Sequence, residues 1–466
     1  MRPKSPHGVV PMWNSDNPFL NGNYAPWREE GDALDLEVEG EIPRGLRGAL
    51  YRIGPNPHFK PRGRYHWFDG DGMVHGFILK DGRAAYRNRY VMTDGLRAEM
   101  KAGRALFGGL LEAAKELPAG TPPFKNAANT NIIGYANRLL ALFEAALPHE
   151  LEPRTLATVG LYDFGGQVSG PVTAHPKLDP LNGDLLFFGY QPFPPYLTWY
   201  RADRAGNLLE ARPLDSGLAV MMHDFAATDN YAIFFVCPSV FRIENPAVGK
   251  PLMNWEPQHG TRIGVMSRRS GQVKWFAAEA FFIFHFLNAY EENDTLVVDG
   301  CRMSALDMSG NSFGQPPFPW RWHLNLADGS VKSEQLEDYV GEFPRLDERR
   351  AGRPHRFGYL AARERSSSGF DAAGFDCVAK RDFQTGKTEF LRLGEGRMTG
   401  EPVFVPRGGK ASEDDGWVMS VWYDPSLNSS ELVIQEAGDF AGRPVARIKA
   451  PHRVPFGFHG NWVPEA

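Results

Sequence analysis

Residues 417–423 read Trp-Val-Met-Ser-Val-Trp-Tyr, a short run of β-branched and aromatic side chains of the kind that favours a strand. Four further runs share this enrichment, at residues 185–190, 231–236, 295–299 and 431–435. Clusters of Gly, Pro, Asn and Asp typical of turns separate such runs, at residues 179–184, 202–206, 327–330 and 383–386. Many short strands with turns between them predict an all-β fold.

The composition agrees with a large β protein that has many turns. The 466 residues include 50 Gly and 37 Pro, scattered along the whole chain, so they indicate turns rather than a linker. Hydrophobic residues make up 42% and charged residues 23%, which is typical of a folded globular protein. A simple sandwich rarely needs this much chain, whereas radially repeated four-stranded blades do and also protect the strand edges. We therefore expect residues 1–466 to form a single β-propeller domain with diverged blades.

Charge and cysteine content exclude several classes of protein. The net charge of −5 is spread over many residues of both signs, which argues against a nucleic-acid partner. Three widely spaced cysteines without a CxxC pair predict no disulfide framework and indicate a reducing compartment: Cys237, Cys301 and Cys377. The sequence has no secretory signal pattern and no run of 18 apolar residues. A cytoplasmic location is the resulting expectation.

One segment has the spacing of a helix. Residues 94–116 place Leu96, Met100, Leu106, Leu110 and Leu111 loosely on one face, and helix-breaking Pro and Gly residues follow from position 118. We expect residues 94–128 to be a helical cap insertion between early strands. Within it, residues 105–114 have two interpretations: a peripheral membrane contact through the leucines, or a helix packed on the propeller.

Four of the 13 histidines lie at strand ends, beside apolar or Gly-rich stretches: His175, His223, His285 and His459. His285 follows Phe-Phe-Ile-Phe, and a buried imidazole in such a run needs a polar partner. A metal ion is one such partner, since imidazole binds iron, copper, nickel and zinc. The alternative is a hydrogen-bonded core histidine at each position. No HxH or HxxxH spacing pairs them, so the spacing leaves both interpretations open.

Several long motifs, in order along the chain, resemble the carotenoid cleavage oxygenases from end to end. They comprise 17–26 (NPFLNGNYAP), 40–48 (GEIPRGLRG), 51–56 (YRIGPN), 67–75 (WFDGDGMVH) and the four histidine contexts, including the C-terminal HGNW at 459–462. The resemblance implies a seven-bladed β-propeller with a cap of helices and loops over one face. It also implies a non-haem Fe(II) on the axis, held by His175, His223, His285 and His459.

The same resemblance implies residues around that metal. Three glutamates would accept the outer N–H of three of the histidines: Glu144, Glu342 and Glu401. The methyl group of Thr130 would screen one open metal position, while O2 uses the other. The alternatives are surface glutamates and an ordinary strand threonine. Asp69 and Asp71 lie between glycines, which more often shape a turn, and we assign them no catalytic role.

The substrate is predicted from the residue before the first glutamate. The family divides between carotenoid or apocarotenoid cleavage and cleavage of phenolic stilbenes and phenylpropenes. The stilbene branch typically has a lysine there that binds the phenol, whereas this chain has Phe143. Phe143 and Phe284 suit an apolar polyene, and we interpret Phe59 and Met221 as core residues. We expect cleavage of a carotenoid or apocarotenoid C=C bond by O2 and Fe(II), with stilbene or phenylpropene cleavage as the alternative.

A protein of a different class also fits an all-β chain of this length. Propellers often serve as binding scaffolds without chemistry, and a fold alone does not give a function. A binding propeller has no need of four histidines with three supporting glutamates, so we favour the enzyme.

Overall fold

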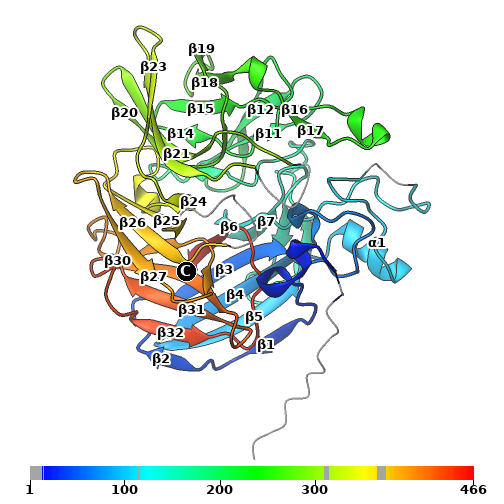
Figure 1. Ribbon diagram of the computed structural model, residues 1–466, viewed down its shortest axis with the longest axis vertical. Helices are drawn as coiled ribbons and strands as arrows, with labels where there is room; N and C mark the ends of the chain where they lie inside the picture. Colours follow the sequence, from blue (N-terminus) through cyan, green and yellow to red (C-terminus); the bar gives the residue numbers. More distant parts are fainter. Residues whose placement is uncertain (1–12, 14, 113–115, 309–313, 365–373, 466) are drawn as a thin grey trace, which may run out of the picture.

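The computed structural model describes residues 13, 15–112, 116–308, 314–364 and 374–465. Seven antiparallel sheets are arranged around a central axis, and a small two-stranded sheet lies at the periphery (Figure 1). This arrangement confirms the predicted all-β, seven-bladed propeller. All five runs predicted as strands form strands, and the four predicted turns connect neighbouring strands.

The first four blades each consist of antiparallel strands that are neighbours in the sheet. Across its sheet, blade 1 contains β1 (Gly31–Ala33), β5 (Arg83–Tyr90), β4 (Gly72–Lys80), β3 (Gly48–Pro55) and β33 (Gly460–Pro464). Blade 2 contains β6 (Asn131–Tyr135), β7 (Arg138–Leu142), β8 (His149–Leu151) and β9 (Thr158–Leu161). Blade 3 contains β10 (Lys177–Leu178), β11 (Leu185–Tyr190), β12 (Leu197–Ala202) and β13 (Leu208–Leu214). Blade 4 contains β14 (Ala226–Ala227), β15 (Tyr231–Val236), β18 (Thr261–Ser267) and β19 (Val273–Ala278).

The remaining strands complete the ring. Blade 5 contains β20 (Phe282–Glu292), β21 (Thr295–Met303), β22 (Phe318–Asn325) and β23 (Val331–Gln335). Blade 6 contains β24 (Val340–Arg345), β25 (Phe357–Arg363), β26 (Cys377–Asp382) and β27 (Lys387–Arg392). Blade 7 contains β28 (Met398–Thr399), β29 (Val403–Pro406), β30 (Gly416–Asp424), β31 (Ser429–Glu436), β32 (Ala446–Lys449) and β2 (Val38–Gly40). The small sheet pairs β16 (Ser239–Phe241) with β17 (Met253–Trp255).

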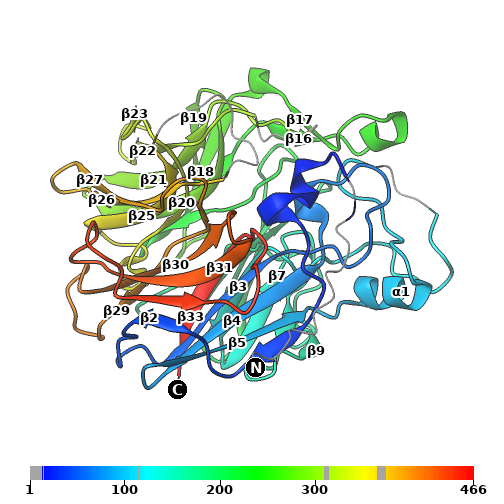
Figure 2. The same cartoon turned by 60° about the horizontal axis from the view of Figure 1, so that its bottom comes forward.

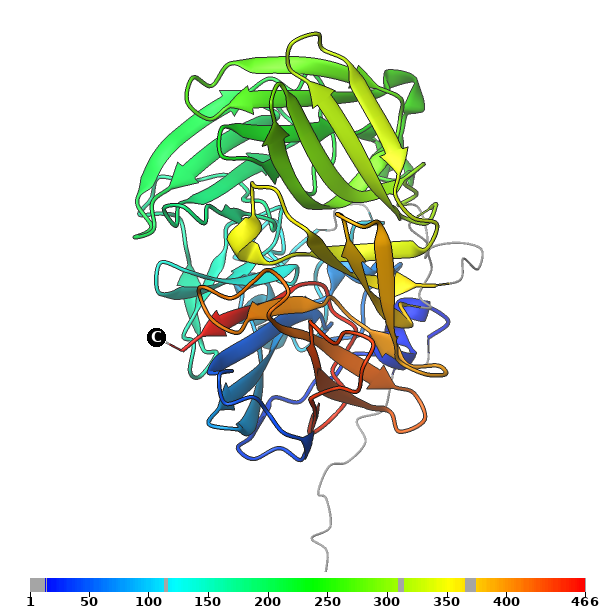
Figure 3. The ribbon, with the colours of Figure 1, turned by 90° about the vertical axis from the view of Figure 1, so that its left-hand side faces the viewer.

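The two ends of the chain close the ring by exchanging strands between neighbouring blades. The C-terminal strand β33 pairs with β3 of blade 1, where Gly460 lies opposite Arg52. The early strand β2 pairs with β32 at the outer edge of blade 7, where Val38 lies opposite Ile448. Figure 3 shows the red C-terminal strand beside the blue N-terminal strands. This exchange joins the first and last blades, so the ring does not depend on side-chain packing alone at that point.

The predicted helix is shorter than the sequence suggested. Among the described residues the single α-helix is α1 (Asp94–Ala102), which lies to one side of the sheets (Figures 1 and 2). The Thr93 side chain caps its first turn, and Gly103, with a φ of 67°, ends it. The prediction of a helix over 94–116 is therefore wrong beyond Ala102. Short 3-10 turns make up the remaining helical residues: Pro18–Leu20, Gly22–Tyr24, Trp67–Asp69, Asn245–Val248, Pro257–His259 and Glu348–Arg350.

The segment after α1 packs on the protein through its leucines. Leu106 and Leu111 are buried, and the Leu110 N–H donates to the Asp69 carboxylate at 2.7 Å. This burial favours the packed interpretation of residues 105–114 over the membrane one, although residues 113–115 lie outside the described part. In that part no helix is long and apolar enough to cross a membrane. The domain boundaries, 1–466 with 94–128 as a cap insertion, stay predictions.

A buried ion-pair network holds this segment to blade 1. The Lys125 ammonium lies 2.7 Å from a carboxylate oxygen of Asp71 and 2.7 Å from one of Glu99 in α1. Asp71 also accepts the His58 backbone N–H at 3.0 Å. Asp69 and Asp71 therefore bind backbone N–H groups and a lysine, which agrees with assigning them no catalytic role.

The inner ends of the blades define the position of the site. Each of β6, β10, β14, β20, β24 and β33 lies at one end of its sheet's strand order. Neighbours among them also touch between blades, as β33 does β6 and β20 does β14 and β24. Residues on or just before these strands therefore converge on the axis although they are far apart in the sequence.

Candidate metal centre

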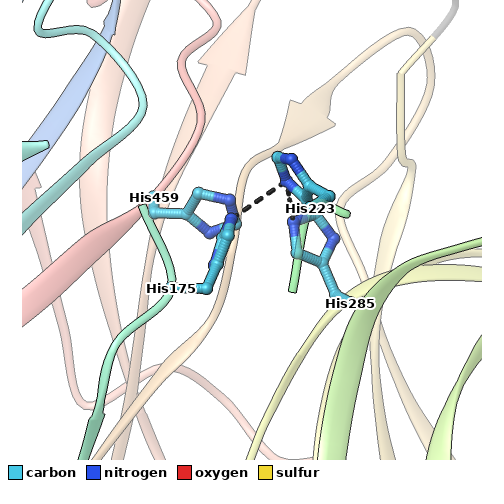
Figure 4. A group of neighbouring side chains, drawn as sticks. All are labelled: His175, His223, His285 and His459. Carbon is cyan, nitrogen blue, oxygen red and sulfur yellow. Dashed lines mark hydrogen bonds between the residues drawn. The ribbon is translucent and has the colours of Figure 1, made fainter. Parts of the chain in front are cut away.

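Four histidines from four blades converge at the axis. His459 directly precedes β33, His175 and His223 lie just before β10 and β14, and His285 lies within β20. Their potential ligand nitrogens all lie within 4.8 Å of one another. Figure 4 shows the four imidazole rings turned toward a common point. The structure thus brings together the four histidines that the sequence singled out.

The ring nitrogens face each other at short range in a buried space. The Nε2 atom of His223 lies 2.9 Å from Nε2 of His175 and 3.2 Å from Nε2 of His285. The four side chains are 5–8% exposed. Bulk water therefore has little access to the nitrogens, and the rings face one another instead.

Local irregularities in β20 direct His285 inward. The register between β20 and β21 shifts between Ile283 and Phe286, and again before Asn288. A β-bulge of this kind redirects a side chain out of the regular alternation. Gly300 on the facing strand permits it, because a Cβ atom there would lie 2.9 Å from the carbonyl oxygen of His285.

A glutamate contacts the outer nitrogen of three of the four rings. Nδ1 of His285 lies 2.5 Å from Oε2 of Glu342, and Nδ1 of His459 lies 2.9 Å from Oε1 of Glu401. Nδ1 of His223 is in close contact with Oε2 of Glu144. An Nδ1–H that points at a carboxylate leaves the Nε2 lone pair free to face the axis. The three predicted glutamates thus lie where they fix the ring orientation.

The surroundings of Glu342 and Glu401 differ. Burial raises the pKa of Glu342 to about 8, and its Oε2 also accepts the N–H of Phe343 at 2.5 Å. Phe343 has a φ of 52°, a left-handed conformation that is strained for an aromatic residue. Burial also opposes the charge of Glu401, but Arg345 and His459 outweigh it and lower its pKa to about 2. Glu401 is therefore held as a carboxylate, facing a cation.

The electrostatics favour neutral imidazoles at three positions. Burial lowers the pKa of His285 to about 3, that of His459 to about 4 and that of His175 well below its usual value. Burial also acts to lower the pKa of His223, but Glu144 outweighs it, so the net shift is upward. Converging neutral nitrogen donors with carboxylates behind them suit a divalent transition metal such as iron, copper, nickel or zinc. The residues present fit a metal ion.

Two cavities of different character reach the four histidines. The first borders His223, His285 and His459 and is mainly aromatic; its other lining residues are Trp67, Phe68, Thr130, Phe143, Glu144, Phe284, Glu342, Phe343 and Phe458. The second, of about 1310 Å³, borders His175, His285 and His459 and includes charged groups such as Lys177 and Asp224. An apolar ligand therefore has one suitable side from which to approach the centre.

The predicted pocket residues lie on the aromatic side. Phe143 and Phe284 both line this cavity, whereas Phe59 and Met221 do not, and Met221 is buried in the core. The ring of Phe143 stacks on Phe124, with centroids 6.1 Å apart and planes 14° from parallel. Phe124 is 53% exposed, so the stacked pair extends the aromatic wall to the surface.

Thr130 lies at the same cavity, just before β6. Its hydroxyl donates to Oδ1 of Asn129 at 3.0 Å, and its carbonyl accepts the His459 backbone N–H at 3.2 Å. The hydroxyl is therefore already engaged within the protein.

Sequence reasoning missed several residues of the site. Trp67, Phe68, Phe343 and Phe458 line the aromatic cavity, and each either adjoins a predicted site residue or lies within one of the family motifs. Adjacency to the predicted ligands was the available signal. Tyr190, whose hydroxyl donates to Oε1 of Glu144 at 2.7 Å, ends an ordinary strand pattern and carries no such signal.

Comparison with known protein families gives one match that spans most of the chain. The profile of a family described as "Retinal pigment epithelial membrane protein" matches residues 24–464. The chain is 35% identical over 488 aligned residues to "Carotenoid 9,10(9',10')-cleavage dioxygenase 1" of Arabidopsis thaliana, with 96% of this chain and 90% of that protein covered.

Two solved structures show the same architecture. The lignostilbene dioxygenase of Pseudomonas brassicacearum superimposes with a TM-score of 0.90 at 33% identity, covering 98% of this chain and 100% of that one. A cobalt-substituted apocarotenoid oxygenase of Synechocystis superimposes with a TM-score of 0.87 at 32% identity, covering 97% and 99%. The similarity therefore extends over the whole propeller in sequence and in structure.

Proposed function

Because this chain belongs to the family that the retinal pigment epithelial membrane protein shares with the carotenoid cleavage oxygenases, we propose that it cleaves a C=C bond of a carotenoid or apocarotenoid with O2, using Fe(II). The observation that carries the proposal is the convergence of four buried histidines, three of them contacted by a glutamate, beside an aromatic cavity. Aldehyde or ketone products would result.

In this proposal His175, His223, His285 and His459 hold the iron. Four imidazoles leave open positions in an octahedral metal, which O2 and substrate need. A bound ferrous ion supplies the electrons that allow O2 to react with an alkene. The protein itself contributes binding and orientation, and no general acid or base is required.

Glu144, Glu342 and Glu401 keep the rings in place. Each accepts the Nδ1–H of one histidine, which fixes the tautomer and aims Nε2 at the metal. Thr130 limits access to one metal position with its methyl group. Its hydroxyl bond to Asn129 supports this role, because it leaves the methyl group as the part of the side chain available to the cavity.

The cavity supports an apolar substrate. Its lining contains no lysine or arginine among the described residues, and Phe143, Phe284 and Phe458 contribute apolar surface. A phenolate placed against these rings would lose its hydration without gaining a charged partner. A polyene has no such cost, so Phe143 and Phe284 are proposed to contact substrate carbon.

The alternative substrate class is a stilbene or phenylpropene. The overall superposition on a lignostilbene dioxygenase favours it, since that TM-score of 0.90 is at least as high as the 0.87 for the apocarotenoid oxygenase. Backbone similarity does not report on the side chain at position 143, so the composition of the cavity decides our preference.

One assay separates these classes. The iron-loaded protein is incubated under O2 with an apocarotenal and, separately, with a 4-hydroxystilbene and its 4-methoxy derivative. We expect an aldehyde from the apocarotenal that needs both iron and O2, and little dependence of stilbene turnover on a free hydroxyl. Fast stilbene turnover that methylation abolishes, without apocarotenal cleavage, would establish the alternative. Absence of cleavage in all three reactions would favour a binding propeller.

A further inference from the structure

The three carboxylates behind the histidines are held in different ways. Glu401 accepts the backbone N–H of Gly460 at 2.8 Å and faces Arg345 at 3.2 Å. Glu342 lies within strand β24 and accepts the N–H of Phe343. Glu144 lies in the turn after β7, outside the strand. Its side chain is 13% exposed, compared with 3% for each of the other two.

Glu144 is therefore the carboxylate with the least support from the backbone. Its Oε2 contacts Nδ1 of His223, and its Oε1 accepts the hydroxyl of Tyr190 at 2.7 Å. Tyr190 ends β11 in blade 3, Glu144 belongs to blade 2 and His223 leads into blade 4. One chain of contacts thus joins three blades and ends at a nitrogen of the metal centre.

Tyr190 is built to remain a donor in a fixed position. It is buried beside Phe188 and Phe241, whose ring centroids lie 6.2 Å and 6.1 Å from its own. Burial, and then the nearby Glu144, raise the pKa of its hydroxyl well above the usual value. The hydroxyl therefore keeps its proton, and the packed ring leaves it little freedom to turn away.

We propose that Tyr190 is a positioning residue of the metal centre, whose hydroxyl fixes the orientation in which Glu144 faces His223. The proposal rests on the proposed function, since it assigns a role within the same site. Without the hydroxyl, the Glu144 carboxylate could rotate in its turn, and the His223 ring would lose a fixed partner. The expected consequence is a weaker and less ordered metal site in an otherwise intact propeller.

The test uses Co²⁺ as a probe in the full-length protein. Its affinity is measured by competition with a chelator, and its d–d absorption reports the ligand geometry. Tyr190→Phe keeps the ring and should weaken Co²⁺ binding about 2- to 10-fold, the worth of one net hydrogen bond, and alter the d–d bands. Tyr51→Phe is the matched control, because it removes a buried hydroxyl that donates to the Pro153 carbonyl at 2.9 Å away from the histidines. It should leave both readouts unchanged.

A double-mutant cycle separates positioning from general stability. In a Glu144→Ala background, Tyr190→Phe should produce no further loss of Co²⁺ affinity, since the acceptor is already gone. Wild-type affinity and bands in Tyr190→Phe would overturn the proposal, and so would an equal loss in both backgrounds. Co²⁺ binding needs no substrate. A protein that binds Co²⁺ in this Tyr190-dependent way but cleaves no alkene would therefore overturn only the proposed function.

Discussion

Arg345 and Glu401 form a buried ion pair directly behind the metal centre, with Nη1 and Oε2 3.2 Å apart. The same carboxylate accepts from Nδ1 of His459, and the same guanidinium donates to the Gly460 carbonyl at 2.8 Å. The pair thus connects blade 6 to the start of β33, so it contributes both to ring closure and to the orientation of one proposed ligand.

Glu401→Gln should therefore impair two properties at once. Metal affinity should fall about 10- to 100-fold, as is usual when the outer partner of a metal-binding histidine is removed. The free energy of unfolding of the metal-free protein should fall by about 1–3 kcal/mol, because a buried charged group loses its partner. Chelator competition and urea denaturation measure the two effects. Glu348→Gln, at the exposed end of the same arginine, is the control; equal effects in both variants would show that the buried pair has no special role.

Lys125→Met should destabilise the protein without removing a metal contact. The substitution leaves the buried carboxylates of Asp71 and Glu99 without their shared cation, at a cost of about 3–5 kcal/mol. The surface variant Lys449→Met, which loses only an exposed pair with Glu37, should change stability by less than about 1 kcal/mol. Urea denaturation of both proteins provides the comparison, and similar midpoints would contradict the role assigned to Lys125.

The extent of the sequence predictions follows from the range of the interactions involved. The strand at 417–423 and the other four runs were predictable because strand preference and turn residues act locally. The helix beyond Ala102 was not, since the leucines at 106, 110 and 111 meet the core from an irregular segment whose position depends on Asp69 and Lys125. Apolar spacing alone does not distinguish a helix face from a coil whose leucines are buried.

The metal centre shows the same division. Its histidines come from four blades, so no local spacing pairs them, and the resemblance to a family was needed to select them. The residues on either side of them then indicated part of the aromatic cavity. Tyr190 could not be predicted, because its contact with Glu144 joins two blades and depends on how these sheets pack.

Phe143→Lys tests the substrate preference. An unpaired ammonium in this aromatic cavity would either lose its proton or admit water, and both harm the binding of a polyene. We expect a large loss of apocarotenal cleavage and at most a small gain with 4-hydroxystilbenes, since one residue seldom rebuilds a site. Phe143→Leu, which stays apolar but loses the stack on Phe124, should keep most of the activity. Steady-state kinetics decide the matter: unchanged apocarotenal cleavage in Phe143→Lys would place the substrate elsewhere.

The most direct test of the four-histidine centre is the iron content of the protein and its histidine variants. Wild type and the four single alanine variants of His175, His223, His285 and His459 are loaded anaerobically with Fe(II), desalted and analysed for metal. His149→Ala, which removes a buried histidine outside the cluster, is the control. We predict iron on every wild-type and control chain and loss of most of it from each of the four variants. Full iron occupancy in two or more of those four variants would contradict the four-histidine centre.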